Sequence, residues 1–425
     1  MIAIEQGFEA EMTDLVVDKP KFYSVMWTIS YGGSISNSPE IKDGVMYFGA
    51  CDQYIYAVDL NTVKEKWRFK ASGIFVEARP LLESSYYYQG CYDGYMYKID
   101  IRTGELVWRF KTGDRITSKP FLHNGVLFFS SFDSNIYAVD DKNGKELWRF
   151  KTGDWSGCGP LVLDGVVYVG SGDGNLYALK ADTGQELWRF KTGGAILHYR
   201  PASHHNNILV FPSSDRNLYA IDIRTQNEIW RFKTGDRTEV TPLIKDGVVY
   251  FGAHDNYFYA LDLGTGKEIW RFRADSWVGD IHPLIHDKIV YFGSPDGSMH
   301  AVSVKDGKLV WKFKTGGEIW ADAVHWNGLI IFGSYDCHMY ALDAKTGKEV
   351  WRFETSSKVQ SVVNVTEQIV VKPEFSGKKE DLEKEGADKY DLLPQLNFTE
   401  SFYAPTVEYA GKDVYGAGKK KYSEI

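Results

Sequence analysis

The stretch DWSGCGPLVLDGVVYVGSGDGNLYALKADTGQELWRFKTG, residues 154–193, contains the pattern that decides the fold. It is divided by three turn signals: Asp164-Gly165, Asp173-Gly174 and the DTG of residues 182–184. Asp-Gly pairs favour tight hairpin turns. The four segments between the turns are short and rich in β-branched and aromatic residues, which is typical of strands. We therefore predict four antiparallel strands in this unit, with no room for a helix.

The unit repeats along the chain, and tryptophan marks its period. The marker residues, spaced by 40 to 42 positions, are Trp27, Trp67, Trp108, Trp148, Trp188, Trp230, Trp270, Trp311 and Trp351. A period of this length with several short strands per repeat is the signature of a propeller blade. We predict an all-β fold, an eight-bladed β-propeller of four-stranded antiparallel blades.

Two further residues recur in each unit, and both have a structural explanation. An aspartate recurs in the second hairpin at Asp52, Asp93, Asp133, Asp173, Asp215, Asp255, Asp296 and Asp336. A proline recurs at Pro39, Pro80, Pro120, Pro160, Pro201, Pro242 and Pro283, with Val324 in the eighth unit. The aspartate satisfies a turn. Proline fits an inner edge strand because it has no N–H to donate. The tryptophan is expected to fill the interface between blades.

The segment ALDAKTGKEVW, residues 341–351, matches the tryptophan-docking motif A-x-D-x-x-T-G-x-x-x-W. Residues 260–270 match it fully as well. Other units depart from the motif at one or two positions. Val63 and Gln226 replace its Gly, Lys180 replaces its Asp, Asn143 replaces its Thr, and Lys98 replaces its Ala. Over residues 27–355 the chain thus resembles the quinoprotein-type (PQQ-like) propeller family. The resemblance is to its non-enzymatic branch, which includes the propeller lipoprotein of the outer-membrane assembly machinery.

The repeats also define the domain boundaries. We expect an N-terminal extension (1–25), the propeller (26–371), a charged linker (372–391) and an aromatic C-terminal tail (392–425). We predict that the ring is sealed by terminal strands, around Trp27 and residues 358–371. A ninth blade composed of these two segments is the alternative.

Composition narrows the functional classes. The net charge of −8 gives no basic field for nucleic acid, so no nucleic-acid partner is expected. No stretch approaches the roughly 18 apolar residues of a membrane span, and the acidic N-terminus does not resemble a signal peptide. We therefore expect a cytoplasmic protein. The four cysteines are far apart in sequence and are expected to be free thiols.

The segment before each recurrent proline provides the candidate site, because in a propeller the first strand of each blade lines the channel. The positions three before and one before the proline are two apart, so on a strand they share a face. Aromatic residues lie in the loops at the same rim. The candidate ligand- or partner-binding residues are Glu77, Arg79, Lys119, Trp155, His198, Tyr199, Arg200, Glu239, Trp277, Asp280, His282, Trp320 and, if it turns inward, Asp322.

Three uses of this channel stay open: a solvated channel whose charges pair with each other, a site for a small molecule or ion, and a site for a partner peptide. We expect a non-enzymatic scaffold that presents its rim and channel mouth to a protein partner, without catalytic residues, metal or cofactor. A small-ligand sensor is the first alternative. The sequence does not indicate the oligomeric state.

The second alternative is a PQQ-dependent oxidoreductase with calcium, as the family resemblance implies. Its stacking residue would be Trp155, Trp277 or Trp320. Its calcium oxygens would come from Glu77, Glu239 or Asp280, and its carboxylate-binding arginines would be Arg79 or Arg200. The chain lacks the adjacent cysteine pair and the long loop insertions that are usual in such enzymes. His204-His205 lies in a first hairpin and is interpreted as a surface turn rather than a metal site.

Overall fold

The computed structural model describes residues 33–76, 79–197, 200–278 and 281–355. These residues form eight four-stranded sheets, called blades 1 to 8 in chain order. The strands of blades 1 to 3 are β1 (Glu40–Lys42), β2 (Val45–Gly49), β3 (Tyr54–Asp59) and β4 (Lys64–Lys70); β5 (Leu81–Glu83), β6 (Tyr86–Gly90), β7 (Tyr95–Asp100) and β8 (Leu106–Lys111); and β9 (Phe121–His123), β10 (Val126–Ser131), β11 (Asn135–Asp140) and β12 (Glu146–Lys151). The strands of blades 4 to 6 are β13 (Leu161–Leu163), β14 (Val166–Gly170), β15 (Asn175–Lys180) and β16 (Glu186–Lys191); β17 (Ser203–His205), β18 (Ile208–Ser213), β19 (Asn217–Asp222) and β20 (Asn227–Lys233); and β21 (Leu243–Lys245), β22 (Val248–Gly252), β23 (Tyr257–Asp262) and β24 (Glu268–Arg273). The strands of blades 7 and 8 are β25 (Leu284–His286), β26 (Ile289–Gly293), β27 (Ser298–Ser303) and β28 (Leu309–Lys314); and β29 (Val324–Trp326), β30 (Leu329–Gly333), β31 (His338–Asp343) and β32 (Glu349–Glu354).

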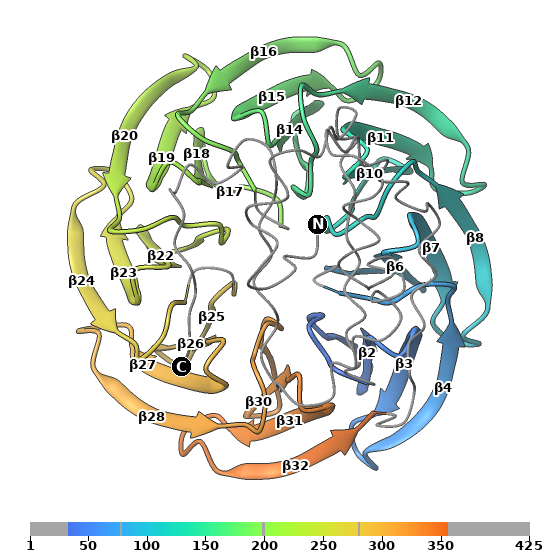
Figure 1. Cartoon of the computed structure of the whole chain (residues 1–425), viewed down its shortest axis with the longest axis vertical. Helices are drawn as coiled ribbons and strands as arrows, with labels where there is room; N and C mark the ends of the chain where they lie inside the picture. Colours follow the sequence, from blue (N-terminus) through green and yellow to red (C-terminus); the bar gives the residue numbers. More distant parts are fainter. Residues whose placement is uncertain (1–32, 77–78, 198–199, 279–280, 356–425) are drawn as a thin grey trace, which may run out of the picture. The chain divides into compact units, whose positions relative to one another are not determined.

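The predicted eight-bladed propeller is confirmed. Each blade pairs its strands antiparallel and in chain order, and the blades follow one another around a ring (Figure 1). The described residues contain no helix long and apolar enough to cross a membrane. The predicted extension, linker, tail and ring-sealing terminal strands lie outside the described residues, so each of them stays a prediction.

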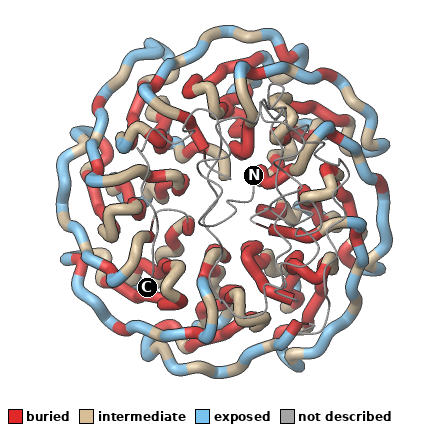
Figure 2. Tube along the Cα trace, in the orientation of Figure 1, coloured by how far each residue is buried: buried red, intermediate tan, exposed pale blue. Residues whose placement is uncertain are grey.

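Local sequence explains the blade. The first hairpin of blade 4 turns at Asp164 (φ 47°) and Gly165 (φ 76°), and this pair of positive φ angles is the type I′ turn that Asp-Gly favours. The second and third strands of each blade are almost entirely buried, whereas the outer strands alternate between covered and exposed residues (Figure 2). The core therefore lies between neighbouring blades. The four cysteines are free, as predicted, and three of them are buried in this core.

The tryptophan of each outer strand packs against the next blade, as the motif predicts. Trp230 Nε1 donates to the Leu263 carbonyl at 2.8 Å, and its ring lies against Gly266. A Cβ added to Gly266 would lie 2.6 Å from that ring, so the motif requires glycine there. The same hydrogen bond is formed by Trp67, Trp108, Trp148, Trp270 and Trp311.

Two tryptophans depart from this arrangement. Trp188 and Trp351 face the two blades in which Gln226 and Val63 replace the motif glycine. These replacements keep a positive φ, of 62° and 53°, although side chains rarely adopt it. Among the described residues, neither Trp188 nor Trp351 forms the indole hydrogen bond that the other six make. We attribute this to the added side chain, which occupies the place where the ring would dock.

The recurrent aspartate does more than satisfy its turn. Asp133 Oδ1 accepts from the Asn135 amide at 3.0 Å, and Asp133 Oδ2 accepts from Tyr137 Oη at 2.6 Å. Oδ2 also accepts from the amide of Gly113, which belongs to the preceding blade, at 2.7 Å. The contact between blades recurs at Asp173, Asp215, Asp255 and Asp336. The aspartate thus links adjacent blades, which the turn interpretation alone did not predict.

Lys98 replaces the motif alanine in blade 2, and its surroundings offset the cost of burying its charge. It is 3% exposed, and its Nζ lies 2.8 Å from Asp141 Oδ1 in blade 3. The ammonium also lies 4.0 Å from the centre of the Tyr86 ring, a cation–π contact. A buried lysine is tolerated here because a carboxylate and an aromatic face replace its water.

Replacing Gly266 by Ala should destabilise the protein by about 1–3 kcal/mol more than replacing Gly247 by Ala. Both glycines have positive φ, so both variants carry the same backbone strain. Only at Gly266 would the new methyl group meet a tryptophan ring, because a Cβ at Gly247 has nothing within 4 Å. Urea denaturation of the two variants measures the difference. Equal losses of stability would contradict the docking role of this glycine.

Candidate functional site

The candidate channel residues lie in the loops that precede the inner strands. Each inner strand has only three residues and begins after the recurrent proline, as β5 begins at Leu81 after Pro80. Arg79, Lys119 and His282 therefore belong to irregular backbone, so the prediction that these three residues lie on a strand is wrong. The inner strands are too short for their two-residue alternation to reach these loop positions.

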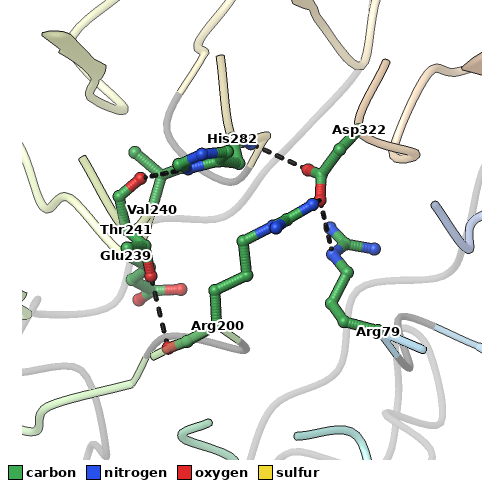
Figure 3. Close-up of a pocket in the computed structure, with 7 residues that line it drawn as sticks. All are labelled: Arg79, Arg200, Glu239, Val240, Thr241, His282 and Asp322. Atoms are coloured by element: carbon green, nitrogen blue, oxygen red, sulfur yellow. Dashed lines mark hydrogen bonds and ion pairs between the residues drawn. The ribbon is translucent and has the colours of Figure 1, made fainter. Parts of the chain in front are cut away.

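Asp322 is the centre of the site (Figure 3). Its carboxylate is 1% exposed and turns inward. Oδ2 lies 3.1 Å from Arg79 Nε and 2.7 Å from Arg200 Nη2. Ser38 Oγ donates to the same oxygen at 2.7 Å, and the His282 amide donates to Oδ1 at 2.8 Å. Asp322 thus joins residues from blades 1, 2, 5 and 7, and we call these five residues the Asp322 cluster.

Every side-chain nitrogen of Arg79 contacts a protein oxygen. Besides the Nε contact with Asp322, Nη1 donates to the Ser36 carbonyl at 3.0 Å and Nη2 to the Trp320 carbonyl at 3.2 Å. The residue is only 3% exposed. Binding another anion would therefore require Arg79 to give up buried hydrogen bonds, which is costly.

The cluster changes the protonation of its members. Burial alone raises the pKa of the Asp322 carboxyl, but the charges of Arg200 and Arg79 outweigh it and hold this pKa well below its ordinary value. Burial, and then the charge of Arg200, lowers the pKa of His282 to about 4. Its neutral imidazole lies with Nδ1 2.8 Å from the Thr241 carbonyl, to which an Nδ1–H can donate. Asp322 is thus ionised and His282 uncharged at neutral pH.

Other candidate charges also have partners. Lys119 Nζ lies 2.8 Å from Glu40 Oε1, which links blade 3 to blade 1. Burial lowers the pKa of Lys119, and Glu40 opposes that effect. Glu239 Oε1 lies 3.1 Å from Arg237 Nε. Glu40 was not predicted, although it carries a charge at a position where most other repeats have an apolar residue after the proline, as at Leu81.

The rim aromatics form two separate groups. Trp155 stacks on Phe132, with ring centres 4.5 Å apart, and Arg115 lies 4.0 Å from the centre of the Phe132 ring. Trp277 stacks on His254 at 4.2 Å, and Trp320 meets Trp277 edge-on at 5.2 Å.

Phe132 and His254 were not among the predicted site residues. Both stand directly before the recurrent aspartate, at a position that varies between repeats and therefore carried a signal. Glu77, His198, Tyr199 and Asp280 lie outside the described residues, so their place in the site remains a prediction.

The described residues do not fit PQQ. The recess lined by Arg79, Arg200, Thr241, His282 and Asp322 holds about 10 Å³, near the lower limit for one water molecule. One face of the Trp155 ring and one face of the Trp277 ring are stacked on other side chains, and each side-chain nitrogen of Arg79 has a protein partner. No group of three or more His, Cys, Asp or Glu in the described part of the chain is placed to hold a metal ion. His204 and His205 lie at the exposed end of β17.

The repeated tryptophan docks and aspartate links define the class of protein, a β-propeller of tryptophan-docked blades. The chain belongs to the PQQ-like repeat family. Its family model, described as outer membrane protein assembly factor BamB, matches residues 19–132, 92–202, 132–256, 174–314 and 255–379. No curated protein matches the chain by sequence.

Three solved structures are similar to the propeller. The computationally designed Ika8 protein is 18% identical, with a TM-score of 0.64, covering 76% of this chain and 97% of its own. BamB from Moraxella catarrhalis is 16% identical, with a TM-score of 0.60, covering 73% and 94%. A europium-containing methanol dehydrogenase is 15% identical, with a TM-score of 0.59, covering 74% and 83%. At these identities the likeness shows the fold alone.

Stability should fall as the pH is lowered from 6.5 to 4, because His282 has a pKa of about 4 when folded and an ordinary value near 6.5 when unfolded. In this window the unfolded chain binds the proton and the folded chain does not, which is worth at most about 3 kcal/mol. Below pH 4 the contribution of ionised Asp322 to the free energy of unfolding is lost as well. The variant His282→Gln should show a shallower decline between pH 6.5 and 4 in urea denaturation. A slope equal to that of the unchanged protein would contradict the assignment.

Proposed function

We propose that this propeller is a non-enzymatic scaffold that binds a protein partner through its rim. The observation that carries the proposal is the Asp322 cluster, because the described charges that a channel ligand would need are bound to one another. Each side-chain nitrogen of Arg79 already has a partner in the protein, and the recess beside it has space for about one water molecule. Membership of a family described by an assembly factor supports a role in protein interaction.

The rim offers the side chains that protein interfaces use. Trp, Tyr and Arg dominate the energy of such interfaces. Trp155, Trp277 and Trp320 are half-buried, and each is held by a neighbouring ring, so that little conformational entropy is lost when a partner binds. These rigid aromatic groups are the surface that we assign to the partner.

The triple variant Trp155→Ala, Trp277→Ala, Trp320→Ala should lose at least tenfold of its affinity for the partner, because it removes three anchors at about 1–2 kcal/mol or more each. The partner is first identified by native mass spectrometry of the complex purified from its own source, and affinity is then measured by calorimetry with the purified partner.

Trp326→Ala is the matched control, since Trp326 lies at the far end of the inner strand of the same blade as Trp320. It should leave the affinity unchanged. A triple variant that keeps full affinity, with an unchanged melting temperature, would refute the rim as the binding surface.

A binding experiment with PQQ distinguishes the scaffold proposal from the oxidoreductase alternative. PQQ added with Ca²⁺ should give no saturable change in the absorption spectrum of the protein at micromolar concentrations, because the described recess has space for about one water molecule and Arg79 and Arg200 are both paired with Asp322. Saturable binding that Arg200→Ala abolishes would replace the scaffold proposal with a ligand-binding one.

A further inference from the structure

We propose that the Asp322 cluster is an ionic clasp that closes the propeller ring between its last and first blades. This role is independent of the partner proposed above. It follows from the missing tryptophan hydrogen bond in the outer part of this interface and from the contacts of Asp322 in its inner part.

The outer part of the interface between blades 8 and 1 lacks a docked tryptophan. Trp351 of blade 8 faces Val63, a β-branched residue at φ 53°, where six other interfaces have glycine. Trp351 still packs beside the apolar residues of blade 1. Among the described residues, the indole hydrogen bond that six other interfaces have is therefore missing here, although Ser34 Oγ donates to the Tyr335 carbonyl at 2.8 Å and the Ile35 amide donates to the Ser334 carbonyl at 3.1 Å across the same junction.

The inner part of the same interface is bridged by the cluster. Ser38 of blade 1 donates to Asp322 of blade 8 at 2.7 Å, and the Asp322 amide returns a hydrogen bond to Ser38 Oγ at 3.2 Å. Arg79 of blade 2 spans the junction, because it binds the Ser36 carbonyl on one side and Asp322 and the Trp320 carbonyl on the other. Arg200 reaches Asp322 from blade 5, across the channel (Figure 3).

Asp322 is a carboxylate at a position where two other repeats carry a cation. β29 begins at Val324, directly after Ala323, so Ala323 and not Val324 occupies the position of the recurrent proline. The residues equivalent to Asp322, two before the first residue of each inner strand, are Ser38, Arg79, Lys119, Gly159, Pro201, Thr241 and His282. Among these repeats, a carboxylate is introduced only in the blade that must join the start of the ring.

The blade 4–5 interface provides the internal comparison. It also lacks a docked tryptophan, because Gln226 replaces glycine opposite Trp188. At this interface the Gly193 amide donates to Asp215 Oδ2 at 2.9 Å, whereas the residue in a position to donate to Asp52 at the blade 8–1 interface lies outside the described residues. Gln226→Gly and Val63→Gly are therefore chemically matched repairs of two different interfaces.

Hydrogen exchange of the full chain, followed by mass spectrometry, tests the clasp. Asp322→Asn should speed exchange at least tenfold in peptides covering β1–β2 and β30–β31, whereas peptides covering β10–β11 and β14–β15 change less than twofold. Adding Val63→Gly to Asp322→Asn should restore at least part of this protection by letting Trp351 dock. Adding Gln226→Gly instead should not restore it.

Each other outcome overturns the proposal. Faster exchange spread evenly over all blades would show a general loss of stability, and equal rescue by the two glycine variants would show that the interface is not specific. If Asp322→Asn does not fold, Ser38→Ala removes one bridge without leaving an unpaired buried charge. Ser38→Ala should speed hydrogen exchange in the same peptides by a smaller factor. Unchanged exchange in blades 1 and 8 would refute the clasp.

Discussion

The structure depends on one close contact: at six of the eight interfaces between blades, the tryptophan ring of the outer strand lies against a glycine of the next blade. A four-stranded blade cannot bury its own faces, so each must be covered by its neighbours. The indole ring fills the widening space between blades and also donates a hydrogen bond to the neighbouring backbone, as Trp230 does to Leu263. At these six interfaces glycine is required because the ring occupies the volume that a Cβ would take.

The fold was predictable because this contact repeats in sequence as well as in space. The spacing of the tryptophans gives the blade length, and Asp-Gly pairs such as Asp164-Gly165 give the hairpins. Both are local signals that do not depend on the rest of the ring. The link from Asp133 to Gly113 of the preceding blade was not predicted, because a turn aspartate has the same local sequence whether or not it reaches another blade.

The candidate site was predictable in part. The position before the proline identified Arg79, Arg200 and His282, all of which line the recess. The repeat pattern did not predict which charged residues would pair with one another. Arg200 meets Asp322, 122 residues further along the chain, because the ring closes, and no local pattern records which blades face each other across a channel. The expected strand face failed because the inner strands are too short for their alternation to extend to the loops.

The charged contacts across the channel also set the order in which the molecule can be completed. Repeat proteins are usually stabilised by nearest neighbours, so their units can assemble from any starting point. Here Ser38 meets Asp322 only after 284 further residues have been made, and both arginines precede their carboxylate in the chain. During synthesis the first seven blades are made without their counter-charge, and the arginines remain hydrated. The last blade to leave the ribosome neutralises them, so ring closure is a late event of folding that depends on the eighth repeat.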